Sequence, residues 1–204
     1  MPSFEKLITP TTGERITFKK GNPIVPNYPI VPFIRGDGTG VDIWPATQKV
    51  LDSAISCSYG NKRKINWFKI YAGDEACEKY GTYNYLPKDT IEAIKFFGIA
   101  IKGPLTTPIG GGIRSLNVAL RQIFDLYSCV RPCKYYTGTP SPHKKPENLD
   151  IVVYRENTED IYMGIEWEAD DQICRDLINH LNDVVIPNSE KLKNRKIPVS
   201  AGIG

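Results

Sequence analysis

A glycine-rich loop between an apolar strand and a helix constrains the fold of this chain more than any other feature. The apolar run at 99–101 predicts a buried strand, and Leu116, Leu120 and Ile123 recur at helical spacing further on. Between them lies the glycine run 110–112, where the backbone is free to approach a ligand closely. The segment therefore predicts a strand, a loop and a helix start that meet at one place.

The rest of the chain repeats the order of strand and helix. Apolar runs predict strands, and amphipathic segments bounded by proline, aspartate or glycine predict helices. Strands are expected at 31–34, 65–71, 126–136, 151–154 and 161–167. Helices are expected at 75–80, 88–97 and 171–184, and two further helices are expected to begin after Gly40 and after Ser115. A short hairpin or edge strand is expected at 14–18, and a loop at 137–146. This order predicts an α/β fold with a largely parallel sheet covered by helices on both faces.

The helix start after the glycine run suits a small anion. Ser115 is a good N-cap residue, and the free N–H groups of a helix start favour negative charge. Asn117 lies in the first turn and Arg121 about one turn further on. Arg131 and Arg155 are further guanidinium groups, each able to hold one carboxylate in two parallel hydrogen bonds. Together these residues predict a site for a ligand with several carboxylates.

Each of these residues has a simpler interpretation when it is taken alone. A serine at a helix start is usually only a cap, and an arginine in a helix usually lies on a solvated face. The prediction of an anion site therefore depends on the concentration of these residue types in one segment.

The motif Gly36-Asp37-Gly38-Thr39-Gly40 follows the strand expected at 31–34 and has only part of the dinucleotide-binding fingerprint. Val41 stands where that fingerprint has its third glycine, and no acidic residue follows at the end of a clear second strand. We therefore expect no standard Rossmann nucleotide site there.

Composition argues against several classes of protein. A net charge of +3 over 204 residues is too small to indicate nucleic-acid binding. No apolar run approaches the length of a membrane span, and the first residues open into no signal-peptide core. The 5 cysteines include no Cys-x-x-Cys pair, so we expect reduced thiols and no zinc site. These features predict a cytoplasmic globular protein that binds neither nucleic acid nor membrane.

Two blocks of the sequence closely resemble the bacterial-type NADP-dependent isocitrate dehydrogenases, of the metal-dependent β-decarboxylating dehydrogenase family. They are 101–131 and Arg155-Glu156-Asn157-Thr158-Glu159-Asp160-Ile161-Tyr162. The resemblance covers essentially the whole chain, including the motif at 36–40 and the block 135–142. Enzymes of this type are longer, so the chain is expected to be an amino-terminal half.

The resemblance also implies an organisation into domains and an oligomeric state. Residues 1–126 are expected to form the first part of a large α/β domain, and 127–159 the first strands of a small domain. Residues 160–204 are expected to form a clasp through which two copies dimerise.

The reaction that the resemblance implies is the oxidation of isocitrate by NADP at its C2 alcohol, followed by loss of the C3 carboxylate and protonation of the enolate. By resemblance, Ser115 and Asn117 contact the carboxylate that distinguishes isocitrate. Arg121, Arg131 and Arg155 hold the substrate carboxylates. A substrate with three carboxylates is thereby matched by guanidinium donors.

Three further residues receive roles from the same resemblance. Thr106 matches a threonine between the substrate and the nicotinamide ring of the cofactor, and Lys102 is expected to make a secondary contact. Tyr162 matches the tyrosine that acts as general acid toward the enolate carbon. Taken alone, a tyrosine between Ile161 and Met163 in a strand is most often a packing residue.

Other parts of the enzyme are expected beyond Gly204. The resemblance places there the ligands of Mg²⁺ or Mn²⁺, a lysine from the other subunit and the pocket for the adenine and 2′-phosphate of NADP. Asp37, Asp125 and Asp160 are not expected to replace those metal ligands. We therefore expect the 204-residue chain alone to be inactive. Some relatives are inactivated by phosphorylation at the serine that matches Ser115, which makes this residue a candidate phosphosite.

Two alternatives remain open at this point. One is a related dehydrogenase that acts on isopropylmalate, homoisocitrate or tartrate. Those relatives replace the Ser-x-Asn element, so Ser115 and Asn117 favour isocitrate. The other alternative is a noncatalytic subunit that binds anions or serves dimerisation.

Overall fold

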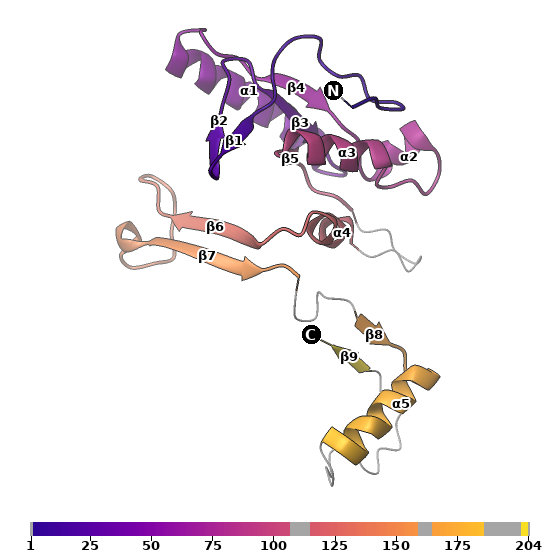
Figure 1. Cartoon of the computed structure of the whole chain (residues 1–204). Helices are drawn as coiled ribbons and strands as arrows, with labels where there is room; N and C mark the ends of the chain where they lie inside the picture. Colours follow the sequence, from indigo (N-terminus) through magenta and orange to yellow (C-terminus); the bar gives the residue numbers. More distant parts are fainter. Residues whose placement is uncertain (1, 107–114, 159–164, 186–200, 204) are drawn as a thin grey trace. The chain divides into compact units, whose positions relative to one another are not determined.

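The computed structural model describes residues 2–106, 115–158, 165–185 and 201–203 (Figure 1). Internal contacts divide the chain into two compact units, Met1–Leu120 and Arg121–Gly204, and each is considered by itself. Within the described parts, no helix has the length and apolar character that a membrane span requires.

The first unit opens with a hairpin that lies later in the chain than the sequence predicts. Strands β1 (Thr17–Lys19) and β2 (Asn22–Ile24) pair in antiparallel fashion. The turn between them is formed by Lys20 and Gly21, whose φ angles are 51° and 79°. Positive φ at both turn residues is typical of tight hairpins. The expected segment 14–18 overlaps β1 only at Thr17 and Phe18. Its first residue, Glu14, instead forms a parallel bridge with Pro29, next to the main sheet.

The central sheet of the first unit is parallel and has the order β4-β3-β5. Strand β3 (Ile30–Ile34) is buried along its whole length and pairs with β4 (Asn66–Lys69) and β5 (Ile101–Lys102). The strand expected at 99–101 is displaced, because Gly98 ends the preceding helix in the left-handed conformation at φ 71°. The chain therefore reaches the sheet only at Ile101.

Helices cover both faces of this sheet (Figure 1). They are α1 (Gly40–Tyr59), α2 (Asp74–Tyr80) and α3 (Lys88–Phe97), close to the expected positions. Trp44 of α1 stacks on Phe33 with ring centroids 4.0 Å apart and meets Trp67 edge to face. Phe97 of α3 packs at 5.5 Å against Phe68, which the register places on the opposite face of the sheet. This two-sided cover confirms the predicted α/β fold.

Helix α4 (Leu116–Ile123) follows Ser115 and leads into the second unit. The second unit contains β6 (Ser128–Lys134), η1 (Pro146–Asn148), β7 (Asp150–Glu156), β8 (Ile165–Trp167), α5 (Gln172–His180), η3 (Leu181–Val185) and β9 (Ala201–Ile203). Antiparallel pairs join β6 to β7 and β8 to β9. The strands expected at 126–136 and 151–154 are thus present as a long antiparallel ribbon. The division at residues 126 and 159 stays a prediction.

Candidate functional site

The start of α4 carries the residues predicted to bind an anion. The carbonyl oxygen of Ser115 accepts a hydrogen bond from the N–H of Ala119 at 3.0 Å, which places Ser115 at the N-cap position. Leucines form the buried side of the helix. Asn117 and Arg121 lie four residues apart and share another, partly exposed face. A hydroxyl, an amide and a guanidinium thus occur within the first turns of one helix.

Arg131 and Arg155 lie on the same face of the β6–β7 ribbon. Arg131 is directly opposite Val153, and Arg155 is directly opposite Cys129. Because opposite residues and alternate residues share a face, the two arginines are diagonal neighbours. The backbone positions of such diagonal neighbours are about 7 to 8 Å apart, a separation that two arginine side chains span easily. The ribbon therefore brings together two of the arginines that are predicted to bind substrate carboxylates.

A cavity of 560 Å³ opens beside Arg155. Its other lining residues are Asp125, Tyr127, Ser128, Tyr154, Glu156 and Thr158. The carboxylate of Glu156 accepts hydrogen bonds from both the N–H and the hydroxyl of Thr158. The cavity is lined by polar and aromatic residues and has a volume in the range of small-molecule sites. Arg155 is thus half-buried at the wall of a pocket rather than on a flat surface.

Thr106 and Lys102 flank the segment that follows β5. The ammonium of Lys102 donates to the carbonyl oxygen of Gly103 at 2.7 Å. The backbone N–H of Thr106 donates to Oδ2 of Asp37 at 3.0 Å, and the N–H of Asp74 donates to Oδ1 of Asp37 at 3.0 Å. The Asp37 side chain is buried, with the residue only 6% exposed. One carboxylate therefore joins three segments that are distant in sequence.

Sequence reasoning missed this contact of Asp37. The motif 36–40 was considered only as a partial nucleotide fingerprint and as part of the family resemblance, and Asp37 only as a residue not expected to replace the metal ligands. The available signal was an aspartate between glycines directly after a fully buried strand, where ligands and loops gather in α/β sheets.

Two glycines of loop 36–40, Gly36 and Gly40, are packed against neighbouring backbone. A Cβ on Gly36 would lie 2.2 Å from the carbonyl oxygen of Pro104, and one on Gly103 would lie 2.0 Å from that of Arg35. Both distances are far shorter than van der Waals contact. Gly36 and Gly103 thus allow the two loops to approach each other closely.

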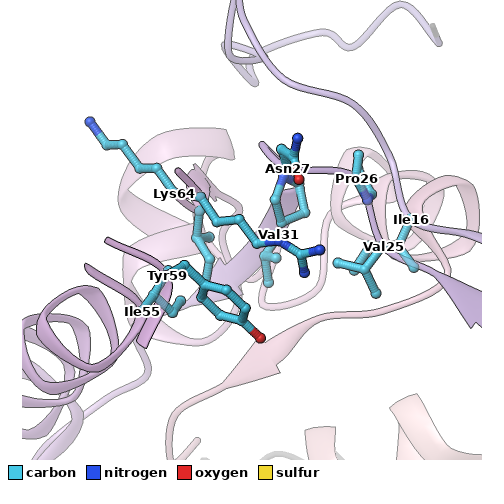
Figure 2. A pocket seen from close by; sticks show the side chains of 11 residues that line it. Ile16, Val25, Pro26, Asn27, Val31, Ile55, Tyr59 and Lys64 are labelled. Atoms are coloured by element: carbon cyan, nitrogen blue, oxygen red, sulfur yellow. The ribbon is translucent and has the colours of Figure 1, made fainter. Parts of the chain in front are cut away.

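A second cavity, of 230 Å³, lies beside the end of α1 (Figure 2). Its walls are Ile16, Val25, Pro26, Asn27, Pro29, Val31, Ile55, Tyr59, Arg63, Lys64 and Ile65. Figure 2 shows the ammonium of Lys64 directed away from the labelled apolar side chains. The guanidinium of Arg63 lies 4.7 Å from the ring centroid of Tyr59. A mostly apolar wall does not suit a ligand with several carboxylates.

The described residues do not fit a complete magnesium or manganese site. Within residues 2–106, 115–158, 165–185 and 201–203, no three His, Cys, Asp or Glu side chains gather closely enough to hold a metal ion. Both oxygens of Asp37 already accept backbone N–H groups. Two predicted features, the general acid Tyr162 and the glycine run 110–112, lie outside the described residues.

Comparisons with known proteins add to this geometry. A family model described as isocitrate/isopropylmalate dehydrogenase matches residues 30–194. Similar curated proteins include the isocitrate dehydrogenases (NADP) of Nostoc sp., 67% identical over 201 residues, of Synechocystis sp., 65% identical over 201 residues, and of Coxiella burnetii, 52% identical over 202 residues. The matches cover 98%, 98% and 99% of this chain but 42%, 42% and 46% of those relatives. The chain thus spans less than half the length of these relatives.

Proposed function

The chain belongs to the isocitrate/isopropylmalate dehydrogenase family, and on this basis we propose that it forms the substrate-binding part of an NADP-dependent isocitrate dehydrogenase. The whole enzyme oxidises isocitrate at C2 with reduction of NADP, releases the C3 carboxylate as carbon dioxide and protonates the enolate to give 2-oxoglutarate. We further propose that it acts in the cytoplasm, in the tricarboxylic acid cycle, as a homodimer.

The start of α4 is the observation that carries this proposal. Ser115 at the N-cap and Asn117 in the first turn offer a hydroxyl and an amide to one substrate carboxylate. Isopropylmalate has an isopropyl group at the corresponding position, and an apolar group there would leave both polar side chains without a substrate partner. The Ser-x-Asn element at this helix start therefore favours isocitrate over isopropylmalate.

Arginines supply the positive charge that the substrate needs. Arg121 shares a helix face with Asn117, and Arg131 and Arg155 are diagonal neighbours on the β6–β7 ribbon. Each guanidinium forms charge-assisted hydrogen bonds worth about 1.5 to 3 kcal/mol net. We propose that all three bind carboxylates of the same isocitrate molecule.

The remaining roles follow from the family pattern. Thr106 contacts the nicotinamide side of the substrate, Lys102 makes a secondary substrate contact, and Tyr162 donates the proton to the enolate carbon. Tyrosine suits this last role because its phenolic O–H can donate a proton and is left as a phenolate.

Substitution at the start of α4 tests the proposal in the full-length protein that carries this sequence. We expect Ser115→Ala and Asn117→Ala each to raise KM for isocitrate about tenfold, the equivalent of one charge-assisted hydrogen bond. Ile123→Ala is the matched control, because Ile123 lies on the same helix and is 48% exposed. Steady-state kinetics with NADP that give all three variants the same KM as wild type would refute the proposed site.

A noncatalytic anion-binding or dimerisation subunit is a second candidate. The intact mass of the native product separates the two candidates. A product of the relatives' length supports the enzyme, and a product no longer than this chain supports the subunit. In an assay with isocitrate, NADP and Mn²⁺, we expect this chain alone to show no turnover above background.

A further inference from the structure

We propose that Asp37 is a positioning residue, which fixes the backbone at Thr106 and thereby sets the placement of this threonine for hydride transfer. The functional half of this inference rests on the proposed function of Thr106. We call the carboxylate of Asp37 together with its two donors, the N–H groups of Asp74 and Thr106, the Asp37 clamp.

The Asp37 clamp uses both oxygens of a buried carboxylate. Oδ1 accepts the N–H of Asp74 and Oδ2 accepts the N–H of Thr106, each at 3.0 Å. A buried carboxylate is stable only when its charge is compensated by hydrogen bonds, and bonds to a charged acceptor are stronger than neutral ones. Because the residue is only 6% exposed and both oxygens are occupied, Asp37 acts through its neighbours rather than on a substrate.

Backbone hydrogen bonds hold the same two loops together. The N–H of Gly103 donates to the carbonyl oxygen of Ile34, and the N–H of Asp37 donates to that of Pro104, both at 2.8 Å. These bonds continue the parallel pairing of β3 and β5 beyond the ends of the strands. Thr106 therefore lies two residues after a backbone anchor and is itself anchored by the carboxylate.

Gly73 closes the space around the carboxylate of Asp37. A Cβ at Gly73 would lie 2.2 Å from Oδ2 and 2.4 Å from Oδ1 of Asp37, and Gly73 has a φ of 75°. The carboxylate is thus enclosed by backbone and keeps one orientation. Gly38, next to Asp37 in loop 36–40, has a φ of 53°, but a Cβ at Gly38 would meet nothing within 4 Å. Position 73 is therefore closely packed against the carboxylate, whereas position 38 is open.

A fixed backbone at Thr106 matters for catalysis because reacting groups must be held in a narrow range of geometry. A displacement of about 1 Å in a positioning group lowers a rate by as much as about 100-fold. The substrate carboxylates, in contrast, are assigned to Ser115, Asn117 and the arginines. Loss of the clamp should consequently reduce kcat more than it weakens isocitrate binding.

Amide hydrogen exchange tests the clamp itself, without any assay of activity. In the wild-type chain, we expect the N–H groups of Thr106 and Asp74 to exchange much more slowly than that of Gly38, although neither donates within a regular strand or helix ladder. Asp74 is informative because the first N–H of a helix is ordinarily unprotected. If the amides of Thr106 and Asp74 exchanged as fast as that of Gly38, the clamp would be overturned. This result needs only the wild-type chain and does not depend on whether any variant folds.

The variant Asp37→Asn then removes half of the clamp at nearly constant volume. An asparagine has one acceptor oxygen, so either Thr106 or Asp74 loses its partner, and we expect exchange at that amide to rise about tenfold or more. Gly38→Asn is the matched control, because asparagine tolerates the left-handed conformation and a Cβ at position 38 would meet nothing within 4 Å. Unchanged exchange at both amides in Asp37→Asn would also overturn the clamp.

Kinetics of the full-length protein test the positioning role. We expect Asp37→Asn to lower kcat per folded active site by about 10- to 100-fold, with KM for isocitrate within about threefold of wild type. Gly38→Asn should leave both constants unchanged. An unchanged kcat per folded site in Asp37→Asn would overturn the positioning role, since a purely structural contact lowers only the folded fraction. If the wild-type protein fails to oxidise isocitrate, the proposed function fails, and the clamp is judged on exchange alone.

Discussion

Asp89, at the start of α3, holds the N-terminal segment through its side chain. Its oxygens accept hydrogen bonds from the N–H groups of Glu5 at 3.0 Å and Lys6 at 2.8 Å, and from the hydroxyl of Tyr80 at 2.8 Å. Burial raises the pKa of Asp89, but these hydrogen bonds to the charged form outweigh burial and keep the pKa below its usual value. Burial and the bond to Asp89 raise the pKa of Tyr80 above its usual range.

The lowered pKa makes the contribution of Asp89 to stability depend on pH. The contribution is complete above the unfolded-state pKa of about 3.9 and is lost as the pH falls through the lower folded-state pKa. We expect Asp89→Asn to reduce the free energy of unfolding by about 1 to 3 kcal/mol at pH 7, and the difference from wild type to shrink below about pH 4. Urea unfolding at several pH values measures both. A loss that stays constant down to about pH 2 would contradict this interpretation.

A matched control for this experiment lies in the same unit. Glu78 is an exposed acidic residue of α2, and Glu78→Gln should change the free energy of unfolding by less than about 0.5 kcal/mol. If Glu78→Gln showed the same loss as Asp89→Asn, the effect would reflect net charge rather than the buried hydrogen bonds.

Ser115 offers a residue-scale test of charge at the proposed substrate site. Aspartate is as good an N-cap as serine, so Ser115→Asp should preserve α4 while it places a negative charge where a substrate carboxylate is proposed to bind. We expect KM for isocitrate to rise by more than about tenfold, and by more than in Ser115→Asn, which is similar in size and uncharged. Normal affinity for isocitrate in Ser115→Asp would exclude an electrostatic effect of phosphorylation at this residue.

At the scale of elements, the pairing of β3 with β5 depends on glycines at the point where the loops that follow these strands contact each other. A Cβ on Gly103 would lie 2.0 Å from the carbonyl oxygen of Arg35. We therefore expect Gly103→Ala to lower the free energy of unfolding by about 1 to 3 kcal/mol, the usual cost of overpacking. Gly21→Asn, in the hairpin turn with nothing within 4 Å, should change it by less than about 0.5 kcal/mol. Equal unfolding curves for the two variants would contradict the role assigned to the loop contact.

Elements with strong local signals could be predicted from the sequence. The helix at 88–97 was predicted at its observed bounds because Pro87 and Gly98 mark its ends. Where the sequence signals at the end of a helix are weaker, the predicted end was wrong. The helix expected to reach Val184 ends at His180 and continues as the π-helical turn η3, since no glycine or proline marks a stop between them.

The candidate site could be predicted in part. The N-cap position of Ser115 follows from local sequence and is observed. The shared face of Arg131 and Arg155 could not be predicted, because it depends on the register of strands that are separated by a long loop. Asp37 contacts Asp74, which lies 37 positions later in the sequence, and Thr106, which lies 69 positions later. No local sequence pattern indicates contacts over such separations.

At the scale of the whole molecule, the chain resembles curated relatives that are more than twice its length. The relatives extend well beyond the matched region, which is 42% to 46% of their length. Among the described residues, the β6–β7 ribbon has two strands, and its residues Val130, Ile151 and Tyr154 are each more than half exposed. A two-stranded ribbon is marginally stable by itself. Activity is therefore best measured on the full-length protein that carries this sequence.

The most direct test of the proposed function is the substrate preference of that full-length protein. The value of kcat/KM is measured for isocitrate and for isopropylmalate, each with NADP and Mn²⁺. A site built around Ser115 and Asn117 predicts a preference for isocitrate of more than about 100-fold, because a polar site rejects a substrate that leaves its hydrogen-bonding groups unpaired. A preference for isopropylmalate, or oxidation of neither acid, would contradict the assignment.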